Sequence, residues 1–332
     1  MAHKITIIGD GGWGTALGLV LQRNGHRVCM WGHDADYIRQ VGETGENSRF
    51  LPGIPMPPDL CWTADIDEAT GDCTTFVVAI PSKFYRPTLE RFTGKIPKTA
   101  AVITVSKGLL DDRRLSEWCR ELLGLEQVAA LSGPSHAEEV AKGAPTAVTI
   151  ASPDHDLAEF FQQLFSQNHF RVYTSTDIVG VELGGALKNV IAIAAGISDG
   201  LGFGDNTKAA LITRGLAELM RLGAAAGGQA ETFAGLSGVG DLIVTCGSKL
   251  SRNRGFGERI GKGESMEEIE ASMSMIAEGV FNARTARDLA RHLGVAVPIT
   301  EEVHAVLYEG KDPRQSLEDL LSRDPKPEPE HS

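Results

Sequence analysis

The chain is poor in cysteine, and its cysteines are not spaced as metal ligands. The five lie far apart and form no C-x-x-C pair, at positions Cys29, Cys61, Cys73, Cys119 and Cys246. We therefore expect neither a disulfide framework nor a metal site, and a reducing compartment fits. The sequence also has no secretory h-region and no uninterrupted apolar run of membrane-spanning length. These absences predict a cytoplasmic protein with no membrane partner.

Basic residues are outnumbered by acidic ones. The 32 Lys and Arg residues face 44 Asp and Glu residues, which gives a formal net charge of -12 at pH 7. Nucleic acids and anionic membranes require a broad basic surface, so neither is expected as a partner. A small anion is still possible, because a local cluster of cations and backbone N–H groups can hold one phosphate.

The first half of the chain alternates short apolar runs with amphipathic stretches. The runs predict strands at residues 5–8, 26–31, 75–80, 101–105, 128–131 and 147–150. Strands that are apolar throughout and separated by helices indicate a mostly parallel sheet covered on both faces. The pattern therefore predicts an α/β domain with a Rossmann-like doubly wound sheet over residues 1–183.

The second half has the hydrophobic period of helices. Helices are predicted at residues 177–195, 207–226, 265–272, 281–293 and 300–307. No convincing strand alternation appears there, so an all-α substrate domain is predicted over residues 184–323. The 332-residue length fits two domains. Alternating prolines and charges predict a disordered tail over residues 324–332.

Residues 9–14 read Gly-Asp-Gly-Gly-Trp-Gly, which is the G-x-G-x-x-G pattern, between a predicted strand and a predicted helix. This context is the one that a dinucleotide fingerprint requires. Gly9 permits the tight turn, Gly11 lets the pyrophosphate approach the backbone, and Gly14 allows close packing of helix on strand. The pattern therefore predicts a dinucleotide on the N–H groups of the helix. A glycine-rich turn without a ligand is the weaker alternative.

The end of the second predicted strand lacks the acidic residue that usually binds the ribose 2′-hydroxyl of NAD. The chain reads Trp31-Gly32-His33-Asp34, so Gly32 or His33 takes that place. His33 either contacts a 2′-phosphate or only caps the loop. Asp34, if it turned inward, would favour NAD. The sequence predicts NAD(P) as cofactor and favours NADP.

Ligands of an open parallel sheet bind beyond the carboxyl ends of its strands. Three loops qualify, at residues 80–82, 106–108 and 132–138. Lys107 is either a solvated charge or, because it follows a strand, a cation at that edge. Ser135 is a plausible helix N-cap, which would not exclude contact with a substrate.

Two segments of the helical half carry candidate catalytic groups. Gly184 and Gly185 precede Lys188 by four and three residues, on one helix face. Either this bare face lets a substrate or nicotinamide ring approach the amine, or it is a packing face from which Lys188 extends to solvent. Residues 251–253, Ser-Arg-Asn, offer hydroxyl, guanidinium and amide donors that suit a phosphate. A polar loop before a helix is the alternative.

Several motifs, taken in order, resemble bacterial-type NAD(P)-dependent glycerol-3-phosphate dehydrogenase along nearly the whole chain. The matching segments lie within residues 7–16, 47–54, 106–108, 132–135, 182–189, 235–242, 251–253 and 276–279. The resemblance implies interconversion of sn-glycerol 3-phosphate and dihydroxyacetone phosphate. It also implies a supply of glycerol 3-phosphate for phospholipid synthesis, and a homodimer.

The resemblance implies roles for single residues. Lys188 matches the proton acceptor. Substrate contacts match Lys107, Gly133, Ser135, Lys188, Asp241, Ser251, Arg252 and Asn253. Cofactor contacts match Gly12, Trp13, His33, Lys107, Ala137, Arg252, Ile276 and Glu278. Gly12 stands where Ser is frequent, and His33 where Arg is frequent, so the choice between NAD and NADP stays open.

The implied reaction moves a hydride between C2 and the nicotinamide while Lys188 takes or gives the hydroxyl proton. A free Lys has a pKa of about 10.4, which is too high for a base near neutrality. Burial and a neighbouring cation, for which Lys107 is the candidate, would lower it. Arg252, with Ser251 and Asn253, would hold the phosphate. Folding must then bring Lys188 close to Arg252 at the mouth of the cofactor cleft.

Two other functions fit parts of this pattern. A dehydrogenase of a hydroxy acid or sugar acid would also use a Lys base, but its substrate carries a carboxylate. A dinucleotide-sensing binding protein would need the glycine-rich loop and not Lys188. Phosphorylated triose and hydroxy acids, tested as substrates, separate these possibilities.

Overall fold

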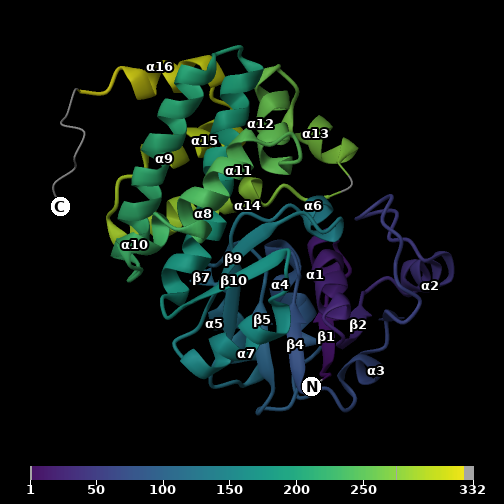
Figure 1. Cartoon of the computed structure of the whole chain (residues 1–332). Coiled ribbons are helices and arrows are strands. Elements are labelled where there is room, and N and C mark those ends of the chain that lie inside the picture. Colours follow the sequence, from purple (N-terminus) through teal and green to yellow (C-terminus); the bar gives the residue numbers. More distant parts are fainter. Residues whose placement is uncertain (1, 274, 325–332) are drawn as a thin grey trace.

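A computed structural model of the chain describes residues 2–273 and 275–324, and it shows a sheet domain followed by a helical domain (Figure 1). The eight-stranded sheet has the order β10-β9-β8-β5-β4-β1-β2-β3. All neighbours are parallel except β8 and β9. The strands are β1 (Lys4–Ile8), β2 (Arg27–Trp31), β3 (Cys61–Thr63), β4 (Thr75–Val78), β5 (Ala101–Thr104), β8 (Ala129–Ser132), β9 (Thr146–Ala151) and β10 (Phe170–Ser175).

Helices cover both faces of this sheet. They are α1 (Gly12–Arg23), α2 (Ala35–Thr44), α3 (Ile66–Thr70), α4 (Ser82–Glu90), α5 (Leu115–Leu123), α6 (Ala137–Ala141) and α7 (His155–Phe165), with a small hairpin of β6 (Leu109–Leu110) and β7 (Arg113–Arg114). Ile7 and Phe161 belong to the core on one face, and Ile8 and Tyr85 to the core on the other. Successive strand residues thus feed opposite cores, and the predicted doubly wound, mostly parallel sheet is confirmed.

The helical domain is built around α8 (Ile178–Gly200). Its other elements are α9 (Asp205–Ala225), α10 (Ala230–Phe233), the π-helical turn η1 (Leu236–Gly240), α11 (Asp241–Gly247), α12 (Arg252–Gly261), α13 (Met266–Ser272), α14 (Glu278–Leu293), α15 (Pro298–Tyr308) and α16 (Pro313–Leu321). Glycines bring α12 against α8, since a Cβ on Gly257 would lie 2.1 Å from the Ile193 carbonyl oxygen. No strand follows β10 in the described residues, so the predicted helical second domain is confirmed.

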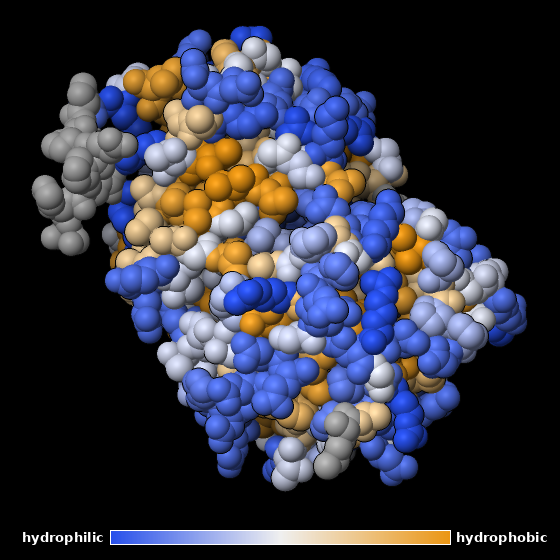
Figure 2. All heavy atoms as spheres, viewed as in Figure 1, coloured by the Kyte–Doolittle hydropathy of each residue, from blue (hydrophilic) through white to orange (hydrophobic). Residues whose placement is uncertain are grey.

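Helix α8 is long and apolar enough to cross a membrane by length and composition, although the sequence shows no uninterrupted apolar run there. Its 18-residue window has a mean hydropathy of 1.6, and 94% of that window is buried inside the protein. Neighbouring helices therefore cover its apolar surface, and we interpret α8 as a core helix. Figure 2 shows a largely hydrophilic surface over the sheet domain and apolar residues gathered around α9 and α11.

The sequence missed β3 and β10. The first is only three residues long, and the second exposes alternate residues at an edge of the sheet, so neither has the continuous apolar run of the central strands. The predicted boundary after residue 183 falls inside the unbroken helix α8. The tail predicted over residues 324–332 lies, apart from Asp324, outside the described residues.

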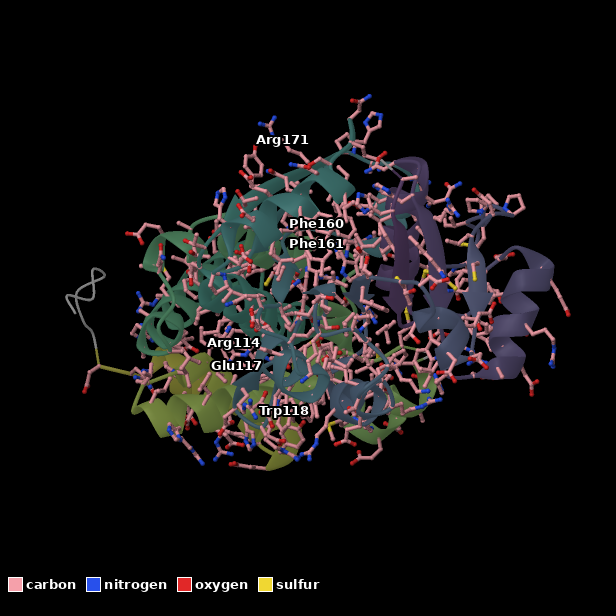
Figure 3. All side chains as sticks on the ribbon, turned by 90° about the horizontal axis from the view of Figure 1, so that it is seen from below. Arg114, Glu117, Trp118, Phe160, Phe161 and Arg171 are labelled. Atoms are coloured by element: carbon pink, nitrogen blue, oxygen red, sulfur yellow. The ribbon has the colours of Figure 1, made fainter. Side chains whose placement is uncertain are left out.

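Glu182 of α8 joins the helical domain to the sheet domain. Its carboxylate accepts hydrogen bonds from the Ser116 backbone N–H at 2.9 Å, from the Ser116 hydroxyl, and from Arg114 Nη1 at 3.1 Å. Arg114 also pairs with Glu117 at 3.1 Å, and the two lie side by side in Figure 3. Since Glu182 is 6% exposed, this contact fixes α8 against the N-terminus of α5 inside the protein.

We predict that Glu182→Gln lowers the free energy of unfolding by about 2 kcal/mol, because the amide NH2 group would face the Ser116 and Arg114 donors where a buried carboxylate oxygen now accepts. Denaturant unfolding followed by circular dichroism measures this change. Asp36→Asn is the control, since the Asp36–Arg39 pair is exposed and its loss should leave stability nearly unchanged. Equal stability of the two variants would contradict the role of Glu182.

Candidate active site

Polar groups from both domains meet beyond the carboxyl ends of β5 and β8. Lys107 follows β5, and Gly133 follows β8 in the sheet domain. Lys188 of α8 and Asp241, the first residue of α11, come from the helical domain. The sequence predicted all four as site residues, and the fold brings them together.

Asp241 lies between two ammonium groups. Its Oδ1 accepts a hydrogen bond from Lys188 Nζ at 2.6 Å, and its Oδ2 accepts one from Lys107 Nζ at 2.7 Å. Lys188 Nζ also lies 2.6 Å from Thr245 Oγ1, and Lys107 Nζ lies 2.8 Å from the Gly133 carbonyl oxygen. Asp241 is 1% exposed and Lys188 is 6% exposed. Both ammonium groups are therefore held in fixed positions by a buried carboxylate.

The electrostatics of this cluster prepare Lys188 to exchange a proton. Burial lowers the pKa of Lys188 to about 8; Asp241 opposes this shift and Lys107 adds to it. Burial alone would raise the pKa of Asp241, but the two ammonium groups outweigh it, so that pKa is lowered. Asp241 thus stays ionised at neutral pH, and Lys188 titrates near the pH at which an enzyme works.

The glycines before Lys188 serve packing and not ligand approach. A Cβ on Gly184 would lie 2.5 Å from the Ser237 carbonyl oxygen, and one on Gly185 would lie 2.4 Å from Ser132 Oγ. The reading in which a substrate or nicotinamide ring approaches across this face is therefore wrong. The alternative is right that this is a packing face and wrong that Lys188 extends to solvent, because its ammonium is buried against Asp241. The missing side chains let η1 and the end of β8 contact the α8 backbone.

The loop after β8 differs from its prediction in one respect. The N-cap of α6 is His136, so Ser135 is not the cap. Its hydroxyl instead donates to the Gly133 carbonyl oxygen at 2.8 Å and lies 3.4 Å from Lys107 Nζ. Gly133 has a φ of +141°, and a Cβ there would lie 3.0 Å from the Val148 Cα. Glycine at this position turns the chain toward Lys107.

The Ser-Arg-Asn segment is only partly available to a phosphate. Ser251 caps α12 by accepting the Arg254 N–H at 3.2 Å. Asn253 Nδ2 donates to Asn189 Oδ1 at 2.8 Å, and its Oδ1 accepts the Gly279 N–H at 2.8 Å. Both ends of the Asn253 amide thus hold α8 and α14 together, which accounts for this residue without a substrate contact.

Arg252 is exposed at the first position of α12, and its Nη1 donates to the Ile276 carbonyl oxygen at 3.1 Å. The charged neighbours that act on it are Glu278 and Glu138. The bonded pair Asn189 and Asn253, which are the chain neighbours of Lys188 and Arg252, brings those two segments together. The guanidinium is therefore the donor of this segment that remains open to a ligand.

Glu278, predicted as a cofactor contact, joins the helical domain to the loop after β4. It begins α14, and its carboxylate accepts the Ser82 N–H at 3.0 Å and the Ser82 hydroxyl. Burial raises its pKa, while the bonds from Ser82 and the charge of Arg252 oppose the rise. Ser82 therefore connects the two sides of the site.

The glycine-rich loop has the shape that a dinucleotide needs. Gly9 has a φ of +120°, and a Cβ there would lie 2.4 Å from the Ala79 carbonyl oxygen. Gly14 touches the strand too closely for a side chain, with a Cβ 2.7 Å from the Gly9 carbonyl oxygen. Gly11 is the N-cap of α1, and nothing lies within 4 Å of its built Cβ. That open space over the first N–H groups of α1 fits a pyrophosphate.

Other predicted cofactor residues surround this loop. A Cβ on Gly12 would lie 2.5 Å from the Phe50 carbonyl oxygen, which explains glycine where Ser is frequent in the resembling family. Trp13 Nε1 donates to the Val105 carbonyl oxygen at 3.1 Å and so ties α1 to the end of β5. Ala137 begins α6, and its Cβ is 3.8 Å from the built Cβ of Gly12.

At the end of β2, His33 is exposed. Asp34 does not turn inward, because it caps α2 by accepting the Tyr37 N–H at 3.1 Å. The predicted NAD-favouring position of Asp34 is therefore wrong. Its short side chain satisfies a helix terminus instead.

Sequence reasoning gave no role to Thr245, Asn189 or Ser82, although it placed Ser82 in a candidate ligand loop and Asn189 in a matching segment. Thr245 stands four residues after Asp241, which places both on one face of α11; that spacing was a usable signal. Asn189 follows Lys188 directly and bonds Asn253 from a distant helix, and Ser82 meets Glu278 across the two domains. No local sequence pattern predicts either of these long-range contacts.

A dinucleotide cradle on a doubly wound sheet, facing a buried lysine from a helical second domain, defines a nicotinamide-dependent dehydrogenase. Models of the NAD-dependent glycerol-3-phosphate dehydrogenase N-terminus and C-terminus match residues 4–158 and 177–318. The chain belongs to the NAD-dependent glycerol-3-phosphate dehydrogenase family.

Relatives over the full length agree. Glycerol-3-phosphate dehydrogenase [NAD(P)+] from Geobacillus thermodenitrificans is 48% identical over 98% of this chain and 96% of its own. The protein of that name from Bacillus velezensis is 49% identical over 96% and 94%. The crystal structure of glycerol-3-phosphate dehydrogenase from Coxiella burnetii has a TM-score of 0.94 at 39% identity, covering 97% of this chain and 99% of that one.

We predict that Asp241→Asn lowers the pKa of Lys188 below about 8, because Asp241 is the group that raises it. The pH profile of kcat/KM should shift to lower pH, and kcat should fall by about tenfold or more as both lysines lose their anchor. Steady-state kinetics across pH measures both effects. Thr245→Val is the comparison: it removes one hydrogen bond and no charge, so its shift should be smaller. An unshifted profile in Asp241→Asn would contradict the cluster's role.

Proposed function

We propose that this chain interconverts sn-glycerol 3-phosphate and dihydroxyacetone phosphate with NAD(P), and that it supplies glycerol 3-phosphate for phospholipid synthesis. The observation that carries the proposal is the buried ammonium of Lys188, with a pKa of about 8, bound to Asp241 beside the strand-end cation Lys107. Membership of the family and relatives of that name over the full length support the substrate.

The chain's own residues would hold the cofactor at the open space over Gly11 and the N-terminus of α1. When bound, NAD(P) supplies the hydride acceptor for oxidation of C2 and the hydride donor for reduction. Trp13 ties this loop to the end of β5, and Ala137 lies beside Gly12. The Ser82–Glu278 contact joins the loop after β4 to the helical domain.

Lys188 would carry the proton. In the oxidation its neutral amine takes the proton of the C2 hydroxyl, and in the reduction its ammonium returns that proton to the carbonyl oxygen. Asp241 stabilises the ammonium form, and the Thr245 hydroxyl, 2.6 Å from Nζ, fixes the direction of the amine. Burial and, to a smaller extent, the charge of Lys107 keep the pKa of Lys188 low. Lys107 would also present a second cation to the substrate oxygen.

The phosphate of the substrate would bind where α12 begins. Arg252 supplies an exposed guanidinium there, and Ser251 caps the same helix. Guanidinium and helix N–H groups together suit a dianionic phosphate. Because the bonded Asn253 and Asn189 join the start of α12 to α8, a phosphate held at Arg252 would place C2 on the Lys188 side of the site.

The competing functions have less support. A hydroxy-acid or sugar-acid dehydrogenase would need a carboxylate site, and the family models and the full-length relatives name glycerol-3-phosphate dehydrogenase. A dinucleotide sensor would not require the Lys188–Asp241–Lys107 cluster. The homodimer and the cytoplasmic location stay predictions.

A spectrophotometric assay tests the proposal directly. Purified protein with dihydroxyacetone phosphate should oxidise NADH or NADPH, whereas 2-oxo acids such as pyruvate should give no turnover. Glycerol 3-phosphate should support the reverse reaction with the oxidised cofactor. Turnover with oxo acids only, or tight cofactor binding without any turnover, would favour one of the competing functions.

We predict that Lys188→Ala lowers kcat by about a thousandfold or more, because the variant loses the amine that we propose accepts the C2 proton. The Kd of the cofactor, measured by calorimetry, should stay within about twofold. Lys262→Ala is the matched control, since Lys262 is exposed and forms a salt bridge with Glu258, four residues before it. Near-normal turnover of Lys188→Ala would reject Lys188 as the base.

The two directions should respond to pH in opposite ways. Oxidation needs the neutral amine of Lys188, so kcat/KM for glycerol 3-phosphate should rise with pH and level off above about 8. Reduction needs the ammonium, so kcat/KM for dihydroxyacetone phosphate should fall as pH rises through that value. Initial rates with saturating cofactor from pH 6 to 10 measure both curves. Parallel curves would contradict the proposed proton transfer.

A further inference from the structure

Asp10, the residue between Gly9 and Gly11 of the glycine-rich loop, is a buried carboxyl with an unused oxygen. The residue is 8% exposed. Its Oδ2 is buried and has no hydrogen-bond donor within the described part of the chain. A buried polar atom without a partner is costly and rare in folded proteins. Such an atom in a ligand-binding loop points to a donor that the ligand brings.

The carboxyl lies against the end of β2. A Cβ built on Gly32 would lie 2.4 Å from the Ile38 Cδ1 and 2.9 Å from the Asp10 Cγ. Gly32 is one of the two positions, with His33, at which the sequence lacks the acidic residue that binds the ribose 2′-hydroxyl in NAD-selective sites. The side chains of Ile38 and Asp10 thus fill the space that a side chain at position 32 would take. The loop supplies the carboxyl that β2 does not.

The other charged groups near Asp10 either have partners of their own or only partly offset the rise in its pKa. Burial, the largest influence, raises the pKa of Asp10, Asp34 adds to the rise, and His33 and Arg49 oppose it. Asp34 is used as the cap of α2. Arg49 lies 3.4 Å from Asp34 and stacks 4.1 Å above the Tyr37 ring centroid. Asp10 is therefore the carboxyl at this end of the loop with free accepting capacity.

We propose that Asp10 accepts a hydrogen bond from the adenosine ribose 2′-hydroxyl and makes this chain favour NAD(H) over NADP(H). The inference rests on the dinucleotide binding of the proposed function. A ribose hydroxyl satisfies the buried oxygen of Asp10, whereas a 2′-phosphate brings negative charge against it. This preference is opposite to the one that the end of β2 alone suggests.

Calorimetric titration of the whole protein with NADH and with NADPH measures the preference without relying on turnover. The wild type should bind NADH more tightly. In Asp10→Ala the ratio of the NADPH Kd to the NADH Kd should fall by about tenfold or more, because the hydrogen bond and the repulsion are both lost. Asp10→Asn keeps a polar partner for the ribose without the charge, so its ratio should lie between the two.

Asp36→Ala is the matched control, because Asp36 is an exposed carboxylate on the nearby helix α2 that pairs with Arg39; both Kd values should stay unchanged. The proposal is overturned if the wild type prefers NADPH, which would mean that His33 and Arg49 dominate. It is also overturned if Asp10→Ala and Asp10→Asn, with unchanged thermal melts, leave the ratio as in the wild type. A wild-type protein that binds neither dinucleotide would contradict the proposed function itself, and this proposal with it. That result differs from both outcomes above, in which a dinucleotide still binds.

Discussion

The structure depends on one buried carboxylate that holds two cations from different domains. Asp241 and Lys188 belong to the helical domain, and Lys107 belongs to the sheet domain. Without the carboxylate, two ammonium groups would face each other in a space with little water, which is strongly unfavourable. With it, they share one anion, and although Asp241 opposes the shift, burial still lowers the pKa of the deeper lysine, Lys188, to about 8. Domain contact and catalysis thus rest on the same three groups.

Close backbone packing makes that arrangement possible. Gly184, Gly185 and Gly257 let η1, the end of β8 and α12 approach α8 within distances that a Cβ would prevent. Glu182 then fixes α8 against α5 through Ser116 and Arg114. This packing and the Glu182 contacts fix the position of α8. Lys188 lies on the same helix, less than two turns from Glu182, so its position is fixed as well. The apolar packing of α8 therefore helps to position Lys188 in the site.

The sequence predicted what short patterns encode. The central strands, the turn at Gly9 and the helices α8 and α14 follow from periodicity and glycine placement. The resemblance supplied Asp241, which pattern alone did not single out as a site residue, whereas the run of polar donors had already indicated Arg252. Prediction failed where a polar side chain has several partners to choose from. Asn253 binds the distant Asn189 and Gly279, whereas Asp34 caps its own helix and Ser135 bonds Gly133, two residues before it. Those choices depend on packing that a single sequence does not display.

Direct titration of Lys188 tests the central claim. Protein labelled with 13C at the lysine Cε, with Lys188→Arg to assign the signal, reports the ionisation of this one amine by nuclear magnetic resonance. The account predicts a midpoint near pH 8 for Lys188. A midpoint at the ordinary lysine value of 10.5 would show that burial against Asp241 and Lys107 does not prepare this residue, and would contradict the account.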